Sequence, residues 1–382
     1  MTYCNKNHIE LDERKNFPML DDNKVYLDSA STTFTPKVVI DSINEYFCNH
    51  QSNYNRGSYD LVLNTTNKIN TIRKKVADFI QAKEEEIIFT NGSTSASNLI
   101  VNKFAIKEFS SNDEVLLCKL DHSSTINPWI NFSQSMKNFN VNIKIQEILI
   151  DLRGNYNQED LIQKVNNNTK YIVLTHTHNV FGLEMEIVNI IKQIREKNPN
   201  TKIVLDCSQS IGHIEVSLNN LDVDYLYFSG HKMFAPTGVG VLYAKNCNYQ
   251  DYEEGTPNIL GIIGLGCAID YINSIGIRNI ENYIYHLTRY LYDQLLTLNG
   301  IEFNKGIDTT KQNIGYGIIS FKHKTISSEE INELLNYYKI YVRSNNFCQE
   351  GQNDYIRISL HIYNNKKDID KLIKVLNSII NN

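Results

Sequence analysis

Residues 222–240 carry the strongest chemical signal in the sequence. An apolar run at residues 225–228 leads directly into Ser229-Gly230-His231-Lys232, and a Pro-Thr-Gly turn follows. The run predicts a buried strand, and open α/β sheets bind ligands at the carboxyl ends of such strands. An isolated lysine would more often be a solvated loop residue, so the interpretation of Lys232 depends on its partners elsewhere in the chain.

A second apolar run, at residues 202–205, ends in Asp206. A carboxylate at the end of a buried strand is costly unless it meets a cation. A protonated pyridine nitrogen would be a suitable cation. A lysine that forms a Schiff base, together with an aspartate on the ring nitrogen, is the pairing that pyridoxal phosphate chemistry requires. The two strand ends therefore predict a pyridoxal phosphate site.

A phosphate site is expected elsewhere in the chain. Asn91-Gly92-Ser93-Thr94-Ser95 lies between a predicted strand at residues 86–90 and a predicted helix. Hydroxyls and backbone N–H groups at the start of a helix can hold a phosphate. Any Ser/Thr-rich helix cap looks similar, so this segment alone is weak evidence for a phosphate site. It supports the prediction because it precedes the Asp206 and Lys232 segments in the chain order that a pyridoxal phosphate site requires.

The elements that must position these residues follow an alternating pattern. We predict strands at residues 25–27, 86–90, 114–118, 141–149, 170–176, 202–206, 225–228 and 240–243, and helices at 37–48, 61–80, 95–108, 158–165 and 188–196. This order predicts an α/β fold with a mostly parallel, seven-stranded-type sheet in a large domain at residues 15–261. Residues 262–382, with 1–14, are predicted to form a smaller α+β domain.

The composition excludes other classes of protein. The 382 residues are 41% hydrophobic and 21% charged, with a net charge of −5, as in an ordinary globular protein and unlike a nucleic-acid binder. No stretch approaches the ~20 apolar residues of a membrane span, so we expect a soluble, cytoplasmic protein. The seven cysteines contain no C-x-x-C pair, which fits neither a disulfide framework nor a zinc site, and no metal is expected.

Together these residues give the sequence a family resemblance. It resembles the fold-type I pyridoxal phosphate enzymes of the class V aminotransferase group, and within it the SufS-type cysteine desulfurases and selenocysteine lyases. The resemblance covers nearly the whole chain. It rests on Tyr26-Leu27-Asp28-Ser29-Ala30, Asn55-Arg56-Gly57, Asp121-His122, residues 175–182, Asp206-Cys207-Ser208-Gln209, Ser229-Gly230-His231-Lys232, Gly255-Thr256-Pro257-Asn258 and residues 355–360.

The resemblance implies roles around the cofactor ring. Lys232 matches the Schiff-base lysine, and Asp206 matches the partner of the pyridine nitrogen. His122 matches the histidine that stacks on the ring and serves in proton transfer. Gln209 and Asn179 match positions near the ring hydroxyl and the substrate.

Further positions match residues that bind the phosphate and the substrate. Thr256 resembles a threonine that reaches the phosphate of the partner subunit, which implies a homodimer. Arg357 matches the arginine that holds the substrate α-carboxylate, so an amino acid substrate is implied. The matched phosphate ligands are Ser93, Thr94, Ser229 and His231.

Cys348 decides which reaction the resemblance implies. It aligns with the cysteine that attacks the substrate sulfur in desulfurases and becomes a persulfide, so we predict conversion of L-cysteine to L-alanine, with sulfur passing on to an acceptor protein. If Cys348 is incidental, the alternatives are a C–S or C–Se lyase or an aminotransferase. A non-catalytic scaffold homologue is a third possibility, against which the set of Lys232, Asp206, His122 and Arg357 argues.

The chain also departs from the family pattern between residues 245 and 256. Relatives have a glycine-rich segment here that helps wall the partner's active site, whereas Lys245 passes almost directly to Tyr252-Glu253-Glu254-Gly255-Thr256. We expect this shortening to open the pocket, to alter the sulfur acceptor, or to change the substrate.

Overall fold

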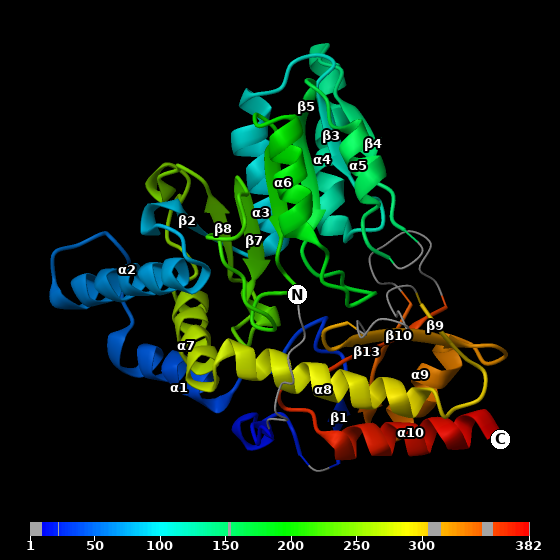
Figure 1. Cartoon of the computed structure of the whole chain (residues 1–382). Coiled ribbons are helices and arrows are strands. Elements are labelled where there is room, and N and C mark those ends of the chain that lie inside the picture. Colours follow the sequence, from blue (N-terminus) through cyan, green and yellow to red (C-terminus); the bar gives the residue numbers. More distant parts are fainter. Residues whose placement is uncertain (1–9, 22, 152–153, 305–314, 346–353, 382) are drawn as a thin grey trace.

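The computed structural model describes residues 10–21, 23–151, 154–304, 315–345 and 354–381. Figure 1 shows an upper part built on a large sheet and a lower part that holds the C-terminal elements, with the long helix α8 (Ile277–Leu295) running between them.

The large sheet has seven strands in the order β2-β8-β7-β6-β5-β3-β4. The pairs β7–β8 and β2–β8 are antiparallel and the other pairs are parallel, which confirms the predicted mostly parallel sheet. Its strands are β2 (Ile87–Thr90), β3 (Glu114–Leu117), β4 (Lys144–Glu147), β5 (Thr169–Thr175), β6 (Lys202–Asp206), β7 (Tyr225–Ser229) and β8 (Gly240–Ala244).

Helices cover both faces of this sheet. Alternate residues of β5 show the division, because Ile172 and Leu174 belong to one apolar core and Tyr171 and Val173 to another. The first core includes α2 (Asp60–Ile80), α6 (Ile187–Lys197) and α7 (Ile259–Ile275), and the second includes α3 (Ser93–Leu99) and α4 (Ser123–Met136). Strands buried on both faces explain why the sequence shows continuous apolar runs.

The C-terminal part holds an antiparallel sheet in the order β12-β13-β10-β9. Its strands are β9 (Ile301–Phe303), β10 (Ile318–His323), β12 (Arg343–Ser344) and β13 (Ile356–Ser359). The N-terminal strand β1 (Val25–Tyr26) pairs in parallel with β11 (Ile340–Tyr341), and Val25 and Leu27 pack in the C-terminal core. The N-terminal segment therefore lies against the C-terminal elements (Figure 1).

The remaining elements complete the chain within the described residues. The other α-helices are α1 (Lys37–Glu45), α5 (Gln158–Lys164), α9 (Ser328–Tyr337) and α10 (Lys366–Asn381). Short 3-10 and π-helical segments are η1 (Arg14–Asn16), η2 (Tyr46–His50), η3 (Glu84–Glu86), η4 (Ile100–Phe104), η5 (Ala105–Lys107), η6 (Lys137–Phe139), η7 (Gly230–Lys232) and η8 (Tyr249–Asp251).

Helix α4 is the main element that the sequence pattern did not predict. The segment contains Pro128 and several Ser and Asn residues, which weaken a helix prediction because proline removes a backbone donor and Asn and Ser are weak helix formers. Burial of Trp129 and Phe132 in the second core stabilises the helix despite this composition. Tertiary packing thus overrides local propensity here.

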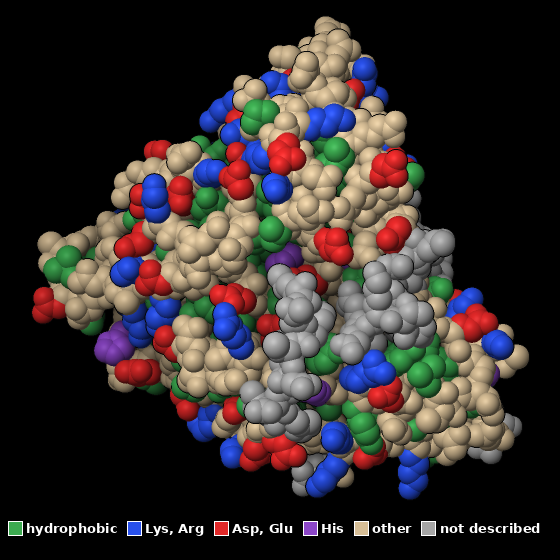
Figure 2. Space-filling view, viewed as in Figure 1, with side chains coloured by type: hydrophobic (Ala, Val, Ile, Leu, Met, Phe, Trp, Pro, Cys, Tyr) green, Lys and Arg blue, Asp and Glu red, His purple; other side chains and the backbone are tan. Residues whose placement is uncertain are grey.

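The surface carries both signs of charge. Figure 2 shows Lys and Arg side chains interspersed with Asp and Glu side chains over this face of the molecule. Among the described residues, no single helix has the length and apolar character of a membrane span; only α7 and α8 taken together do, and they meet at a bend of 75°.

Candidate functional site

A cavity of about 570 Å³ lies at the carboxyl ends of β5, β6 and β7, and its wall also includes residues of the N-terminal and C-terminal segments. The sequence predicted a site at this edge of the sheet. The predicted residues that line the cavity are Ser93, Thr94, His122, Asn179, Asp206, Gln209, Ser229, His231, Lys232 and Arg357.

Asp206 is buried at the last position of β6, and both of its carboxylate oxygens are held. The Thr125 hydroxyl donates to Oδ2 at 2.6 Å, and the Ser208 backbone N–H donates to Oδ1 at 2.8 Å. Thr125 lies in the first turn of α4, three residues after His122. The sequence prediction missed Thr125, although residues three apart on a helix share a face and could have drawn attention to it.

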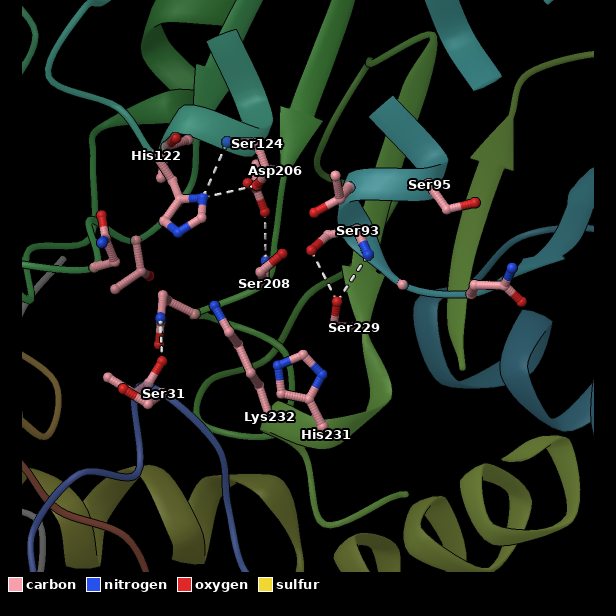
Figure 3. Close-up of a pocket in the computed structure, with 18 of the residues that line it drawn as sticks. Ser31, Ser93, Ser95, His122, Ser124, Asp206, Ser208, Ser229, His231 and Lys232 are labelled. Atoms are coloured by element: carbon pink, nitrogen blue, oxygen red, sulfur yellow. Dashed lines mark hydrogen bonds between the residues drawn. The ribbon is translucent and has the colours of Figure 1, made fainter. Parts of the chain in front are cut away.

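His122 caps the N-terminus of α4 and presents its ring to the cavity (Figure 3). Its Nδ1 accepts the Ser124 backbone N–H at 3.2 Å and lies 2.7 Å from the Ser124 hydroxyl, so the neutral ring carries its proton on Nε2. Burial, with the nearby charge of Lys232 as the second cause, lowers the pKa of His122 to about 4. The ring is therefore neutral at neutral pH.

Lys232 follows β7 on the short turn η7 and points into the cavity beside His231 (Figure 3). The turn is fixed because the His231 carbonyl accepts the Thr33 backbone N–H at 2.8 Å. Burial, with the charge of Lys232 as the second cause, lowers the pKa of His231 to about 4. His231 is therefore neutral at neutral pH, and Lys232 is the charged side chain of this turn.

A cradle of hydroxyl and backbone donors forms where α3 begins beside the end of β7. The Ser229 hydroxyl accepts the Ser93 backbone N–H at 2.7 Å and lies 2.8 Å from the Ser93 hydroxyl (Figure 3). Gly92 has a φ of +142°, and a Cβ on Gly240 would lie 2.6 Å from the Gly92 Cα. Two glycines thus let the loop approach β8 closely and present donors suited to a phosphate.

Several buried polar atoms in the cavity wall lack a hydrogen-bond partner among the described residues, and those of Ser208 and Gln209 lie beside Asp206 in the chain. Gln209 donates from Nε2 to the Ala30 carbonyl at 2.8 Å, but its Oε1 is unsatisfied, as is the Ser208 hydroxyl oxygen. Leaving a buried acceptor unsatisfied costs about 1–3 kcal/mol. A ligand with hydroxyl or N–H donors would satisfy them, so the wall fits a polar, phosphorylated ring compound.

Arg357 lies on β13 and is 3% exposed. Its Nη2 donates to Asp28 Oδ1 and to the Ser31 hydroxyl, both at 2.8 Å, and its Nη1 donates to the Asn179 carbonyl at 3.1 Å. Burial lowers the pKa of Arg357, and the charge of Asp28 opposes that shift. The sequence prediction missed Ser31, which directly follows the Asp28-Ser29-Ala30 motif.

One predicted site residue that the structure describes, Thr256, lies outside this cavity. Thr256 is exposed and lines a neighbouring cavity of about 490 Å³. Its hydroxyl donates to Asn53 Oδ1 at 3.3 Å. Cys348 lies outside the described residues. Thr256 does not belong to the set that the structure brings together around Lys232.

The shortened chain before Thr256 is anchored by a buried ion pair. Both carboxylate oxygens of Glu253 accept hydrogen bonds from Arg73 at 2.7 Å, and the guanidinium lies over the rings of Phe89 and Tyr249, 4.5 and 3.5 Å from their centroids. Glu253 Oε1 also accepts the backbone N–H of Phe89 at 2.7 Å, on the edge strand β2. The connection from β8 to α7 is therefore fixed in place.

Comparison with known proteins agrees with this geometry. Residues 25–251 and 246–372 match the model of the aminotransferase class V family. The chain belongs to this family. It is 32% identical over 403 residues to a cysteine desulfurase of Wigglesworthia glossinidia brevipalpis, covering 95% of each chain, and 31% identical over 401 residues to a probable cysteine desulfurase of Staphylococcus epidermidis, covering 95% and 94%.

A solved structure has the same overall fold. The apo structure of a cysteine desulfurase from Thermococcus onnurineus NA1 matches with a TM-score of 0.90 at 28% identity, covering 98% of this chain and 99% of the other. Within the class V aminotransferases the chain therefore groups with the cysteine desulfurases. The family resemblance and the fold class predicted from the sequence are both confirmed.

Proposed function

We propose that this protein is a pyridoxal phosphate-dependent cysteine desulfurase, which converts L-cysteine to L-alanine and transfers the sulfur to Cys348. One observation carries the proposal: Lys232, Asp206, His122 and Arg357 come from four distant parts of the chain and line one cavity. A scaffold protein has no need of this set. The relatives named cysteine desulfurase support the choice of reaction.

The residues around the cavity divide into a ring-binding and a phosphate-binding group. Pyridoxal phosphate, when bound, supplies an electron sink for a negative charge at the substrate α-carbon. The Asp206 carboxylate, held by Thr125 and Ser208, would face the ring nitrogen and keep it protonated. Donors for the phosphate would come from Ser93, Thr94, Ser229 and His231.

The other residues bind the substrate and move its protons. Arg357 would hold the α-carboxylate, next to the Asn179 carbonyl that fixes one of its nitrogens. The Lys232 amine would take the proton from the α-carbon. His122 would hand over a proton from Nε2, because its Nδ1 is occupied by Ser124. The cavity walls would keep bulk water away from these transfers.

The sulfur step is a nucleophilic displacement by Cys348. Its thiolate would attack the substrate sulfur, so that an S–S bond forms, the C–S bond breaks, and the electron pair of that bond goes to the substrate carbon, which then takes up a proton to give alanine. The persulfide on Cys348 would pass its sulfur to an acceptor protein. Thr256 is exposed and outside the cavity, which supports a role in the second active site of a homodimer.

The test is incubation of the purified protein with L-cysteine. We expect alanine and, without reductant, one added sulfur on Cys348 by intact mass, both lost in Cys348→Ser but retained in Cys48→Ser, which removes an exposed cysteine far along the chain. We also expect a visible absorbance band that is absent from Lys232→Ala. Pyruvate, a keto acid, or alanine formation that persists in Cys348→Ser would overturn the proposal.

A further inference from the structure

Two arginines lie opposite each other in the wall of the cavity. Arg343 on β12 and Arg357 on β13 are directly opposite partners of an antiparallel pair, and both line the cavity. Like charges at directly opposite positions destabilise a pair of strands. This unfavourable pairing indicates a binding function, because two guanidinium groups side by side form a receptor for an anion.

One hydroxyl joins the two guanidinium groups. The Ser31 hydroxyl accepts Arg357 Nη2 at 2.8 Å and Arg343 Nη1 at 3.0 Å, and it donates to Asp28 Oδ1 at 2.8 Å. A serine hydroxyl has one donor and two acceptor sites, so these three contacts use its full capacity. Ser31 therefore has a single favoured orientation, with its proton toward Asp28 and its lone pairs toward the arginines.

The segment that carries Ser31 is held against the same sheet. Leu27 donates to the Tyr341 carbonyl at 2.8 Å and accepts the Ser359 backbone N–H at 2.7 Å. The Ala30 backbone N–H then donates to the Ser359 hydroxyl at 2.9 Å. Because the bridge and both arginines rest on one framework, their geometry is set before any ligand arrives.

The charges at this bridge suit an anion with one negative charge. Asp28 provides one carboxylate against the two guanidinium groups of Arg343 and Arg357. Arg357 is almost fully buried, so water screens this balance weakly. The receptor therefore retains one net positive charge toward the cavity, which matches a single carboxylate.

We propose that Ser31 is a positioning residue for the substrate α-carboxylate: its hydroxyl, oriented by Asp28, holds Arg343 and Arg357 together as one receptor. The inference rests on the proposed function in two respects: the cavity binds pyridoxal phosphate, and Arg357 binds an amino acid carboxylate. Ser31 contributes to the affinity for the substrate carboxylate, and the chemistry at the α-carbon does not depend on Ser31.

The test uses the holoenzyme and two simple probes, L-alanine and ethylamine, which differ by the carboxylate. Binding of each is followed by the change in cofactor absorbance. We expect Ser31→Ala to raise the Kd for L-alanine about tenfold, as for loss of a hydrogen bond to a charged group, and to leave the Kd for ethylamine within about twofold. Ser31→Thr keeps the hydroxyl and should restore L-alanine binding.

Two further variants sharpen the result. Ser42→Ala removes a hydroxyl on α1 that donates to the Val39 carbonyl, and it should change neither Kd. In an Arg343→Gln background, Ser31→Ala should lose most of its effect, because there is no second guanidinium left to join. An equal change for both probes, or no change for L-alanine, would overturn the inference. Since L-alanine binding needs no desulfurase turnover, failure of the proposed reaction would show separately, as absence of alanine from L-cysteine.

Discussion

The ion pair between Arg73 and Glu253 gives the sharpest stability prediction. The Arg73 side chain is 2% exposed and that of Glu253 is 12% exposed, and two hydrogen bonds of 2.7 Å join them. Glu253→Ala leaves a buried guanidinium without its counter-charge, which costs about 3–5 kcal/mol. It also removes the acceptor of the Phe89 N–H, which water at the sheet edge can replace only in part. We expect a loss of about 4 kcal/mol in the free energy of unfolding.

The assay is urea unfolding followed by circular dichroism, with a control next in the sequence. Glu254 pairs with Lys103 at 3.3 Å, but the two side chains are 80% and 49% exposed, so Glu254→Ala should cost under about 1 kcal/mol. Replacing both buried partners, Arg73→Met with Glu253→Met, should recover most of the stability, because no buried charge is left alone. Equal small losses for Glu253→Ala and Glu254→Ala would refute the argument that burial makes this pair the anchor.

Three further predictions concern the site and its acid stability. Thr125→Val removes the donor to Asp206 and should raise the Kd for pyridoxal phosphate about tenfold, measured by absorbance on dialysis. Gly240→Ala places a Cβ 2.6 Å from the Gly92 Cα, so it should weaken pyridoxal phosphate binding while leaving binding of pyridoxal, which lacks the phosphate, largely unchanged. Burial lowers the pKa of His213 from 6.5 to about 4, so the unfolded chain takes up the proton first. This histidine alone should contribute a loss of roughly 2–3 kcal/mol in stability as pH drops through that window, and His213→Asn should reduce the fall of the melting temperature in acid by its share, since burial shifts the pKa of other histidines in the same way.

Each of these has a matched control. Thr125→Ser keeps the hydroxyl and should bind the cofactor as the wild type does, so equal loss in both variants would contradict the role of the hydrogen bond. For Gly240→Ala, parallel losses for pyridoxal phosphate and pyridoxal would show that the phosphate cradle is not what the substitution disturbs. His50→Gln removes a histidine that is 44% exposed and should leave the pH dependence unchanged.

The architecture and the residues at the strand ends could be predicted from the amino-acid sequence. Apolar runs that alternate with amphipathic stretches follow from strands buried on both faces, and this pattern is local in the chain. Asp206 and Lys232 could be placed together because the carboxyl ends of parallel strands meet at one edge of a sheet. Helix α4 could not be predicted from the sequence, since burial of its aromatic side chains outweighs a composition that disfavours a helix.

The contacts that support the predicted residues could be identified only from the folded structure. Thr125 contacts Asp206 across 81 positions of sequence, and Ser31 contacts Arg357 across 326. The Ser31 contact depends on the register of β13 against β12 and on the pairing of β1 with β11, which no local periodicity encodes. The sequence thus determined which residues bear the chemistry, and the fold determined the hydrogen bonds and counter-charges that hold them in position, because those arise only when distant strands meet.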